Sequence, residues 1–273
     1  MIKKLGKDIT WIRTGGEVDI FEPNSIYELK SFLKNNKKVI PVGFGSNIII
    51  PDSGLDKTII RLNNMQNDIQ INSDHLTINA GTPNIIVSRF CTENNLSNLE
   101  FLHTIPGTIG GALYMNAGAY GYCVSDYLLW AELIDLDGNI HRLNRCEIKY
   151  EYRKSNIPDG MIFLKGCFKV ENCNNVKNKI KQMKQYRNDK QPRVNTFGSV
   201  FTNHAKYNAW KLIEQSGCYG MKIGGAYISE LHCNFIINDG SATSKNIKDL
   251  INQIQQKVFN HSGILLEEEV IFL

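Results

Sequence analysis

Apolar residues recur along the chain at the spacing that amphipathic helices require. The clearest case is 243–263, where a Thr–Ser pair begins the segment, Gly263 ends it, and apolar residues stand at positions 247, 250, 251, 254 and 258. A second helix is predicted over 23–36, with Asn24 or Ser25 as its cap. Three more are predicted over 176–190, over 207–217, and over 82–95 with Thr82 as cap and Pro83 in the first turn.

Shorter apolar runs, bounded by turn residues, predict strands. These runs cover 37–43, 57–63, 75–81, 161–170, 233–239 and 264–273, and a hairpin is predicted around Asp137 and Gly138. Residues 99–122 are rich in glycine and are predicted to form a loop. Strands and helices do not alternate regularly, so the pattern indicates an α+β fold and not a doubly wound sheet. The pattern changes after Val170, where we place a domain boundary.

The composition is that of an ordinary globular protein, with 42% hydrophobic and 21% charged residues over a length of 273. The net charge of +4 comes from scattered lysines and arginines, so we expect no nucleic-acid partner. No apolar run is long enough to span a membrane and no signal peptide is apparent, so we expect a cytoplasmic protein without a membrane partner. Seven widely spread cysteines without a C-x-x-C pair indicate reduced thiols and no metal site.

Two glycines interrupt the polar turn that follows the predicted strand 37–43. Gly43 and Gly45, with Ser46 and Asn47, allow successive backbone N–H groups to point toward one place, as a pyrophosphate requires. Ile48 stands where the dinucleotide fingerprint has its third glycine, and an extended segment follows instead of a helix, so this is not a Rossmann motif. From this motif alone, a simple turn between two strands explains the segment better.

A denser glycine segment covers 105–121. Five glycines are separated by small residues, although each glycine costs roughly 0.5–1 kcal/mol against alanine in a regular element. Close approach of a planar or phosphorylated ligand to the backbone would offset that cost. The alternative is a glycine-rich loop that packs on itself.

Seven blocks of sequence occur in a fixed order and at fitting distances. They closely resemble the UDP-N-acetylenolpyruvoylglucosamine reductase family, in its short form without an extra tyrosine loop: "GFGSN", "IPGTIGGALYMNAGAYG", "YEYRKSN", "KQPRVNTFGSVFTN", "AWKLIEQSG", "IGGAYISELHCNFIIN" and "LLEEEV". The resemblance extends from about Arg13 to the last predicted strand. It implies an FAD-binding domain of the vanillyl-alcohol-oxidase type in two lobes, 1–55 and 56–170, and a smaller α+β substrate-binding domain over 171–263, with 264–273 packing close to the first lobe.

The resemblance also implies the chemistry. NADPH would reduce a non-covalent FAD, whose N5 would pass hydride to C3 of the enol ether of UDP-N-acetylglucosamine enolpyruvate, and a proton would reach C2. The product would be UDP-N-acetylmuramate, for peptidoglycan precursor synthesis and cell wall biogenesis. The implied cofactor-binding residues lie in the two glycine segments: Gly43, Phe44, Gly45, Ser46, Asn47, Pro106, Gly107, Thr108, Gly110, Gly111, Asn116, Ala117 and Gly118.

Three residues match the catalytic positions of the family. The resemblance implies that Arg153 stabilises the substrate carboxylate, that Ser199 donates the proton to C2, and that Glu269 assists polarisation of the enol carboxylate. Alternation along the predicted last strand places Glu267 and Glu269 on one face, so spacing does not choose between them; the match to the family selects Glu269. Substrate-binding positions match Tyr152, Asn203 and Gln215, whereas His232 is at least as well explained as a core histidine.

One position departs from the family pattern. Thr202 stands where the family usually has a lysine, which removes a charge that His204 or Lys206 would have to replace. A degenerate or differently specific FAD-binding relative is therefore one alternative. Another is an oxidoreductase of the same fold that uses oxygen and an alcohol, although the chain lacks a covalent-flavin motif. We expect a monomer whose partner is a small sugar nucleotide.

Overall fold

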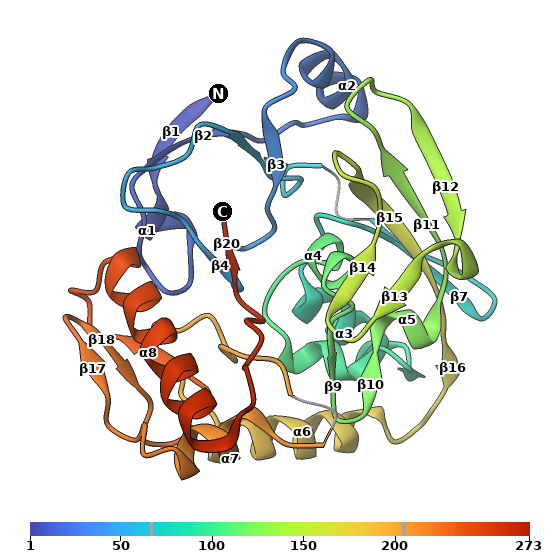
Figure 1. The fold of residues 1–273 in the computed structure, drawn as a ribbon. Coiled ribbons are helices and arrows are strands. Elements are labelled where there is room, and N and C mark those ends of the chain that lie inside the picture. Colours follow the sequence, from blue (N-terminus) through green and yellow to red (C-terminus); the bar gives the residue numbers. More distant parts are fainter. Residues whose placement is uncertain (66–67, 204–205) are drawn as a thin grey trace. The chain divides into compact units, whose positions relative to one another are not determined.

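A computed structural model describes residues 1–65, 68–203 and 206–273, and the chain divides into two compact units. Unit 1 consists of Met1, Ile20–Gly43 and Lys57–Arg187, and unit 2 consists of Ile2–Asp19, Phe44–Asp56 and Asn188–Leu273. Helices and strands are mixed in both units, which confirms the α+β class (Figure 1). No helix among the described residues is both long enough and apolar enough to cross a bilayer.

Unit 1 is built on a five-stranded antiparallel sheet in the order β12-β11-β15-β7-β6 (Figure 1). Its strands are β6 (Ile69–Asn72), β7 (His75–Asn79), β11 (Leu128–Ile134), β12 (Ile140–Asn144) and β15 (Ile162–Lys169). Six of the eight residues of β15 are buried, as expected for a strand covered on both faces. The predicted hairpin at 131–143 is confirmed as the β11–β12 connection, with Gly138 at φ 86°.

Helices and short strands complete unit 1. The helices are α2 (Ile26–Asn35), α3 (Asn84–Glu93), α4 (Ile109–Tyr114), α5 (Val124–Tyr127), most of α6 (Val176–Lys190) and the 3-10 turns Glu100–Thr104 and Arg145–Glu147. The last two residues of β2 (Glu17–Phe21) pair in parallel with β5 (Thr58–Ile60), which pairs in parallel with β3 (Val39–Pro41). The antiparallel pairs are β8 (Leu96–Ser97) with β16 (Glu171–Asn172), β9 (Gly118–Ala119) with β10 (Tyr122–Cys123), and β13 (Lys149–Glu151) with β14 (Lys154–Asn156). Buried side chains of α2, α3 and α4 pack with those of β7, β11 and β15 into one core.

Unit 2 has its own core around α8 (Ser244–Ser262). Thr243 and Asn246 form a reciprocal capping box at its start, and Gly263 ends it at φ 71°, as the sequence predicts. The helix packs with α7 (Ala209–Gln215) and the sheet of β17 (Lys222–Ile223), β18 (Ala226–Ile228) and β19 (Ile236–Asn238). The remaining elements are β1 (Ile2–Leu5), α1 (Gly6–Ile9), and β4 (Ile48–Ile49) paired in parallel with β20 (Ile271–Phe272).

Three local predictions are wrong. Pro83, not Thr82, occupies the cap position of α3, and the hydroxyl of Thr82 is buried without a hydrogen-bond partner. The loop predicted over 99–122 contains helix α4, because Thr108 caps it by accepting from the Gly111 N–H. The strand predicted over 264–273 is regular only at Ile271–Phe272; Glu268 makes an isolated bridge.

Candidate active site

The first glycine segment meets the second within unit 1. A Cβ on Gly43 would lie 2.5 Å from Oγ1 of Thr108, so only glycine allows this approach. The rest of the first segment, 44–47, belongs to unit 2, where Gly45 has φ 67° and its carbonyl accepts from the Trp11 N–H at 3.0 Å. The segment connects β3 to β4, so it is also the turn between strands that the alternative interpretation required.

The second glycine segment packs closely on the chain that follows β7. The Asn84 N–H donates to the Gly107 carbonyl at 3.0 Å, and the Gly110 N–H donates to the Ala80 carbonyl at 2.8 Å. Part of the glycine content is therefore explained by backbone packing. Gly111 is different, since a Cβ there would meet no atom nearer than the Thr108 hydroxyl at 3.8 Å.

These segments suit an FAD molecule by their glycines and small side chains, which would let a flat or phosphorylated ligand come near the backbone, as at Gly111. The N–H groups of Ile109, Gly110 and Ala112 already donate to backbone carbonyls. Asn116 contributes differently: its side chain donates to the Glu151 carbonyl at 2.8 Å and accepts from the Ser125 N–H at 3.2 Å. That amide is therefore used to hold the protein's own backbone.

Arg153 lies at the tip of the hairpin formed by β13 and β14. Its backbone is left-handed at φ 58°, which is uncommon for a non-glycine residue. The half-buried guanidinium lies 4.8 Å from the Tyr152 ring centre and donates to the Gly118 carbonyl at 2.9 Å. The Ser155 hydroxyl also donates to the Tyr114 carbonyl at 2.7 Å, so this hairpin is fastened to the second glycine segment at several points.

Ser199 lies in unit 2 on an extended segment between two other stretches of chain. On one side it forms an antiparallel bridge with Phe235, and the Val200 N–H donates to the Asn234 carbonyl at 2.9 Å. On the other side, the Val200 carbonyl accepts from the Glu269 N–H at 2.8 Å. Ser199 is half-buried, and the next two side chains are 1% exposed, so they anchor the segment in the core.

Glu269 is brought beside this segment although 70 positions separate it from Ser199 in the chain. Its carbonyl accepts from the Asn47 side-chain amide at 2.9 Å, and the Asn47 carbonyl accepts from the Ile271 N–H at 3.1 Å. Within unit 2, the Asn47 side chain and backbone hydrogen bonds therefore connect the first glycine segment, Glu269 and the Ser199 segment. Glu268 pairs with Lys248 at 2.9 Å, and Glu267 is exposed, whereas Glu269 is half-buried.

The predicted substrate-binding residues are partly or fully accessible. Tyr152 is exposed beside Arg153, and Gln215 is exposed at the end of α7. Asn203 is exposed, and its side-chain oxygen accepts from the Ala209 N–H at 3.0 Å, at the start of α7. Thr202 is half-buried and donates its N–H to the Glu267 carbonyl at 2.9 Å. His204 lies outside the described residues.

Asn234 and His232 lie beside the Ser199 segment, which their spacing in the sequence did not predict. Asn234 accepts from the Val200 N–H through its carbonyl, and His232 accepts from the Asn234 N–H. His232 is half-buried against the Phe235 ring at 4.8 Å, and burial lowers its pKa. Its Nδ1 accepts from the Asn234 N–H at 3.2 Å. The signal in the sequence was a polar residue within the apolar run 233–237, since a buried amide requires partners.

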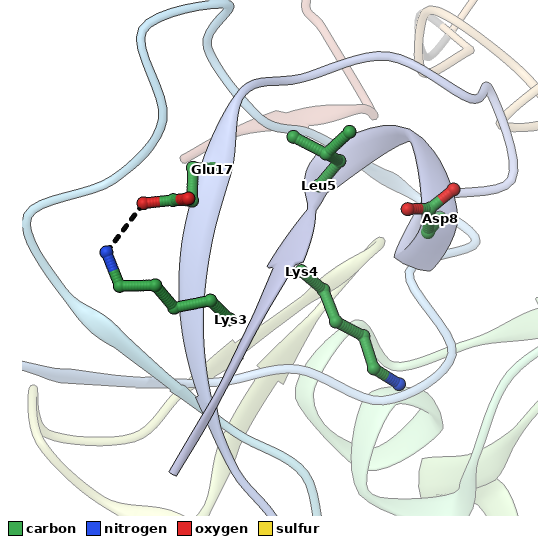
Figure 2. Close-up of a pocket in the computed structure, with 5 residues that line it drawn as sticks. All are labelled: Lys3, Lys4, Leu5, Asp8 and Glu17. Atoms are coloured by element: carbon green, nitrogen blue, oxygen red, sulfur yellow. Dashed lines mark hydrogen bonds and ion pairs between the residues drawn. The ribbon is translucent and has the colours of Figure 1, made fainter.

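A shallow surface hollow lies elsewhere in unit 2. It is lined by Lys3, Lys4, Leu5, Asp8 and Glu17, and Lys3 pairs with Glu17 at 2.6 Å (Figure 2). None of these residues matches a catalytic or binding position of the family resemblance. An exposed ion pair such as Lys3–Glu17 contributes little to the free energy of folding.

Comparison with known proteins gives consistent results over the chain. A family model described as the C-terminal domain of UDP-N-acetylenolpyruvoylglucosamine reductase matches residues 190–273, and one described as an FAD binding domain matches residues 20–144. The UDP-N-acetylenolpyruvoylglucosamine reductase of Rickettsia prowazekii is 42% identical over 271 residues, which cover 97% of this chain and 92% of the relative. That of Rickettsia bellii is 42% identical over 272 residues, covering 97% and 90%. The crystal structure of the Thermus caldophilus enzyme superposes with a TM-score of 0.88 at 28% identity, covering 99% of this chain and 98% of that one.

Proposed function

Since the chain belongs to the UDP-N-acetylenolpyruvoylglucosamine reductase family, we propose that Arg153, Ser199 and Glu269 are the residues with which it reduces its substrate. The protein is an FAD-containing oxidoreductase of peptidoglycan precursor synthesis, and it acts on a small sugar nucleotide. The predicted family, the FAD cofactor and the reduction of UDP-N-acetylenolpyruvoylglucosamine are thereby confirmed, whereas the route of hydride and proton is our proposal. The roles of individual residues remain our proposal.

The two glycine segments hold the FAD in this proposal, and at Gly111 the missing side chain would give its phosphates or ring access to the backbone. Gly43 and Thr108, which pack against each other, are assigned to the same site. A bound FAD would supply the hydride chemistry between NADPH and C3 of the enol ether. The other assigned residues are Phe44, Gly45, Ser46, Asn47, Pro106, Gly107, Gly110, Asn116, Ala117 and Gly118. Asn116 and Asn47 act in part by supporting the Arg153 hairpin and the Glu269 segment, to which their side chains are bound.

Arg153 stabilises the substrate carboxylate. Addition of hydride at C3 leaves negative charge at C2 that spreads into this carboxylate, and a guanidinium remains protonated and matches a carboxylate's two oxygens. The hydrogen bond to the Gly118 carbonyl and the contact with Tyr152 fix the guanidinium before substrate arrives, so little reorganisation is required.

Ser199 donates the proton to C2. A serine hydroxyl is a weak acid in water, but a carbanion-like carbon is a strong base, so a well-placed hydroxyl suffices without an adjacent histidine and carboxylate. The hydroxyl must therefore be held in a fixed position. Hydrogen bonds on both sides of Val200, the next residue, support this. Glu269, held beside the same segment, assists polarisation of the enol carboxylate.

Tyr152, Asn203 and Gln215 bind the substrate in this proposal. Thr202 contributes a hydroxyl where most of the family has a charge, so binding of the anionic substrate or NADPH is weaker than with a lysine. The predicted lobes 1–55 and 56–170 and the substrate-binding domain 171–263 remain a proposal, as do a monomeric state and a cytoplasmic location. The compact units described above differ from these lobes, since 20–43 and 57–187 fall in one of them.

The observation that carries the proposal is the meeting of the Ser199 segment with Glu269 through the Val200 backbone in unit 2. The test is a spectrum and a turnover assay on purified protein. We expect flavin absorbance, and NADPH oxidation that is sustained only when UDP-N-acetylenolpyruvoylglucosamine is present. A flavoprotein that oxidises an alcohol with oxygen, or one with no turnover, would instead favour one of the alternative FAD-binding relatives.

A further inference from the structure

Asn234 makes the hydrogen bonds to Phe201 that a neighbouring strand would make in a regular sheet. Phe201 lies two residues after Ser199. The side-chain oxygen of Asn234 accepts from the Phe201 N–H at 3.0 Å, and its side-chain nitrogen donates to the Phe201 carbonyl at 2.8 Å. A carboxamide has one acceptor and one donor in the geometry of a peptide group, so it can satisfy both backbone groups of one residue. Asn234 is 4% exposed, and water therefore does not compete for these hydrogen bonds.

The main chain of Asn234 extends the same clamp toward Ser199. Its carbonyl accepts from the Val200 N–H at 2.9 Å, and its own N–H donates to Nδ1 of His232 at 3.2 Å. Asn234 thus holds three backbone groups of two successive residues: the Val200 N–H, the Phe201 N–H and the Phe201 carbonyl. These groups immediately follow Ser199 in the chain.

We propose that Asn234 is a positioning residue for proton donation by Ser199. The proposal rests on the proposed role of Ser199 and adds the residue through which the fold sets the position of that hydroxyl. The Ser199–Phe201 segment belongs to no regular strand, so the periodic hydrogen bonds that would hold it in a sheet are replaced by this amide and by the pairing with Glu267–Glu269. A displacement of about 1 Å in a reacting group lowers a rate by about 100-fold.

The test uses Asn234→Ala in the FAD-loaded enzyme, with Asn238→Ala as a matched control. Asn238 is also a buried amide, 3% exposed, whose side chain binds backbone, but at Ile12, Gly240 and Ala242 instead of Phe201. Two rates are followed by flavin absorbance: reduction by NADPH, and reoxidation by UDP-N-acetylenolpyruvoylglucosamine. We expect Asn234→Ala to reduce normally, to reoxidise about 10- to 100-fold more slowly, and to show a larger solvent deuterium isotope effect.

Two further measurements separate positioning from a general structural role. Hydrogen exchange at the Phe201 amide is expected to accelerate in Asn234→Ala and to stay unchanged in Asn238→Ala. In a Ser199→Ala background, Asn234→Ala is expected to slow reoxidation little further, because a residue that acts through Ser199 has nothing left to position. If Asn234→Ala does not fold, Asn234→Ser is measured in the same way, since its small hydroxyl cannot hold both groups of Phe201.

The outcomes distinguish this inference from the proposed function. Slow reoxidation of Ser199→Ala with normal reoxidation of Asn234→Ala would overturn the inference alone. Equally slow reoxidation of Asn234→Ala and Asn238→Ala would also overturn it. So would a double variant in which the effects of Asn234→Ala and Ser199→Ala on the reoxidation rate are fully additive. Normal reoxidation of Ser199→Ala would refute the proposed role of Ser199 itself.

Discussion

Arg153 combines an unfavourable backbone conformation with a proposed catalytic role, and the two can be separated by substitution. At φ 58° an L-residue is strained by about 1–2 kcal/mol, whereas glycine adopts this conformation freely. Arg153→Gly and Arg153→Ala both lose the hydrogen bond to Gly118 and the contact with Tyr152, but only the alanine variant keeps the strain. Glycine's greater freedom in the unfolded chain offsets roughly 0.5–1 kcal/mol of the difference.

The glycine variant is therefore expected to be more stable than the alanine variant by about 0.5–1 kcal/mol. In a protein of this size that difference raises the melting temperature by about 1–4 °C. Both variants are expected to reoxidise with the sugar nucleotide about 100- to 1,000-fold more slowly than wild type, the usual loss when one charge-stabilising donor is removed. Thermal unfolding of the FAD-loaded variants and stopped-flow reoxidation measure the two quantities.

The stability prediction and the reoxidation prediction can be refuted independently. An alanine variant as stable as the glycine variant would show that Arg153 is not strained. Reoxidation of Arg153→Gly at the wild-type rate would remove Arg153 from the catalytic residues, whatever its effect on stability.

Three other predictions concern unit 2. Glu269→Gln is expected to slow reoxidation about 10- to 100-fold while Glu267→Gln, at an exposed position, stays near wild type; the reverse order would reassign the catalytic glutamate. Thr202→Lys is expected to lower the KM for the sugar nucleotide about two- to fivefold, since a half-exposed charge pair contributes up to ~1 kcal/mol, and an unchanged KM would contradict this. Burial lowers the pKa of His232 below 6.5, so below about pH 6.5 the unfolded chain binds a proton that the folded one does not; stability should fall there, and less steeply in His232→Gln. Identical pH profiles of the melting temperature in the two proteins would refute that assignment.

Local signals in the sequence predicted most helices well. Ser25 accepts from the Glu28 N–H at the start of α2, and Thr243 and Gly263 bound α8, because caps act within a few residues. Helix α4 escaped prediction because its glycines have poor helix propensity. Packing against Ala80 and the Thr108 cap outweigh that propensity, and the contact with Ala80 is not visible in a local window.

The active site depended more on family resemblance than on periodicity. The Ser199 segment and Glu269 are joined by single hydrogen bonds, such as that from the Glu269 N–H to the Val200 carbonyl. These join irregular segments and leave no periodic pattern in the sequence. The Asn234 clamp is invisible for the same reason, although a lone amide in an apolar run indicated that some partner was required. Glu267 and Glu269 share a face only in a regular strand, and the strand in the structure begins at Ile271.

The central claim is that Ser199 delivers the proton to the sugar nucleotide, and rapid mixing tests it most directly. Ser199→Ala loaded with FAD is first mixed with NADPH and then, after reduction, with UDP-N-acetylenolpyruvoylglucosamine. We predict flavin reduction at the wild-type rate and reoxidation slowed by about 100- to 10,000-fold, the range for loss of a general acid. Reoxidation at the wild-type rate, or an equal loss in both steps, would contradict the claim.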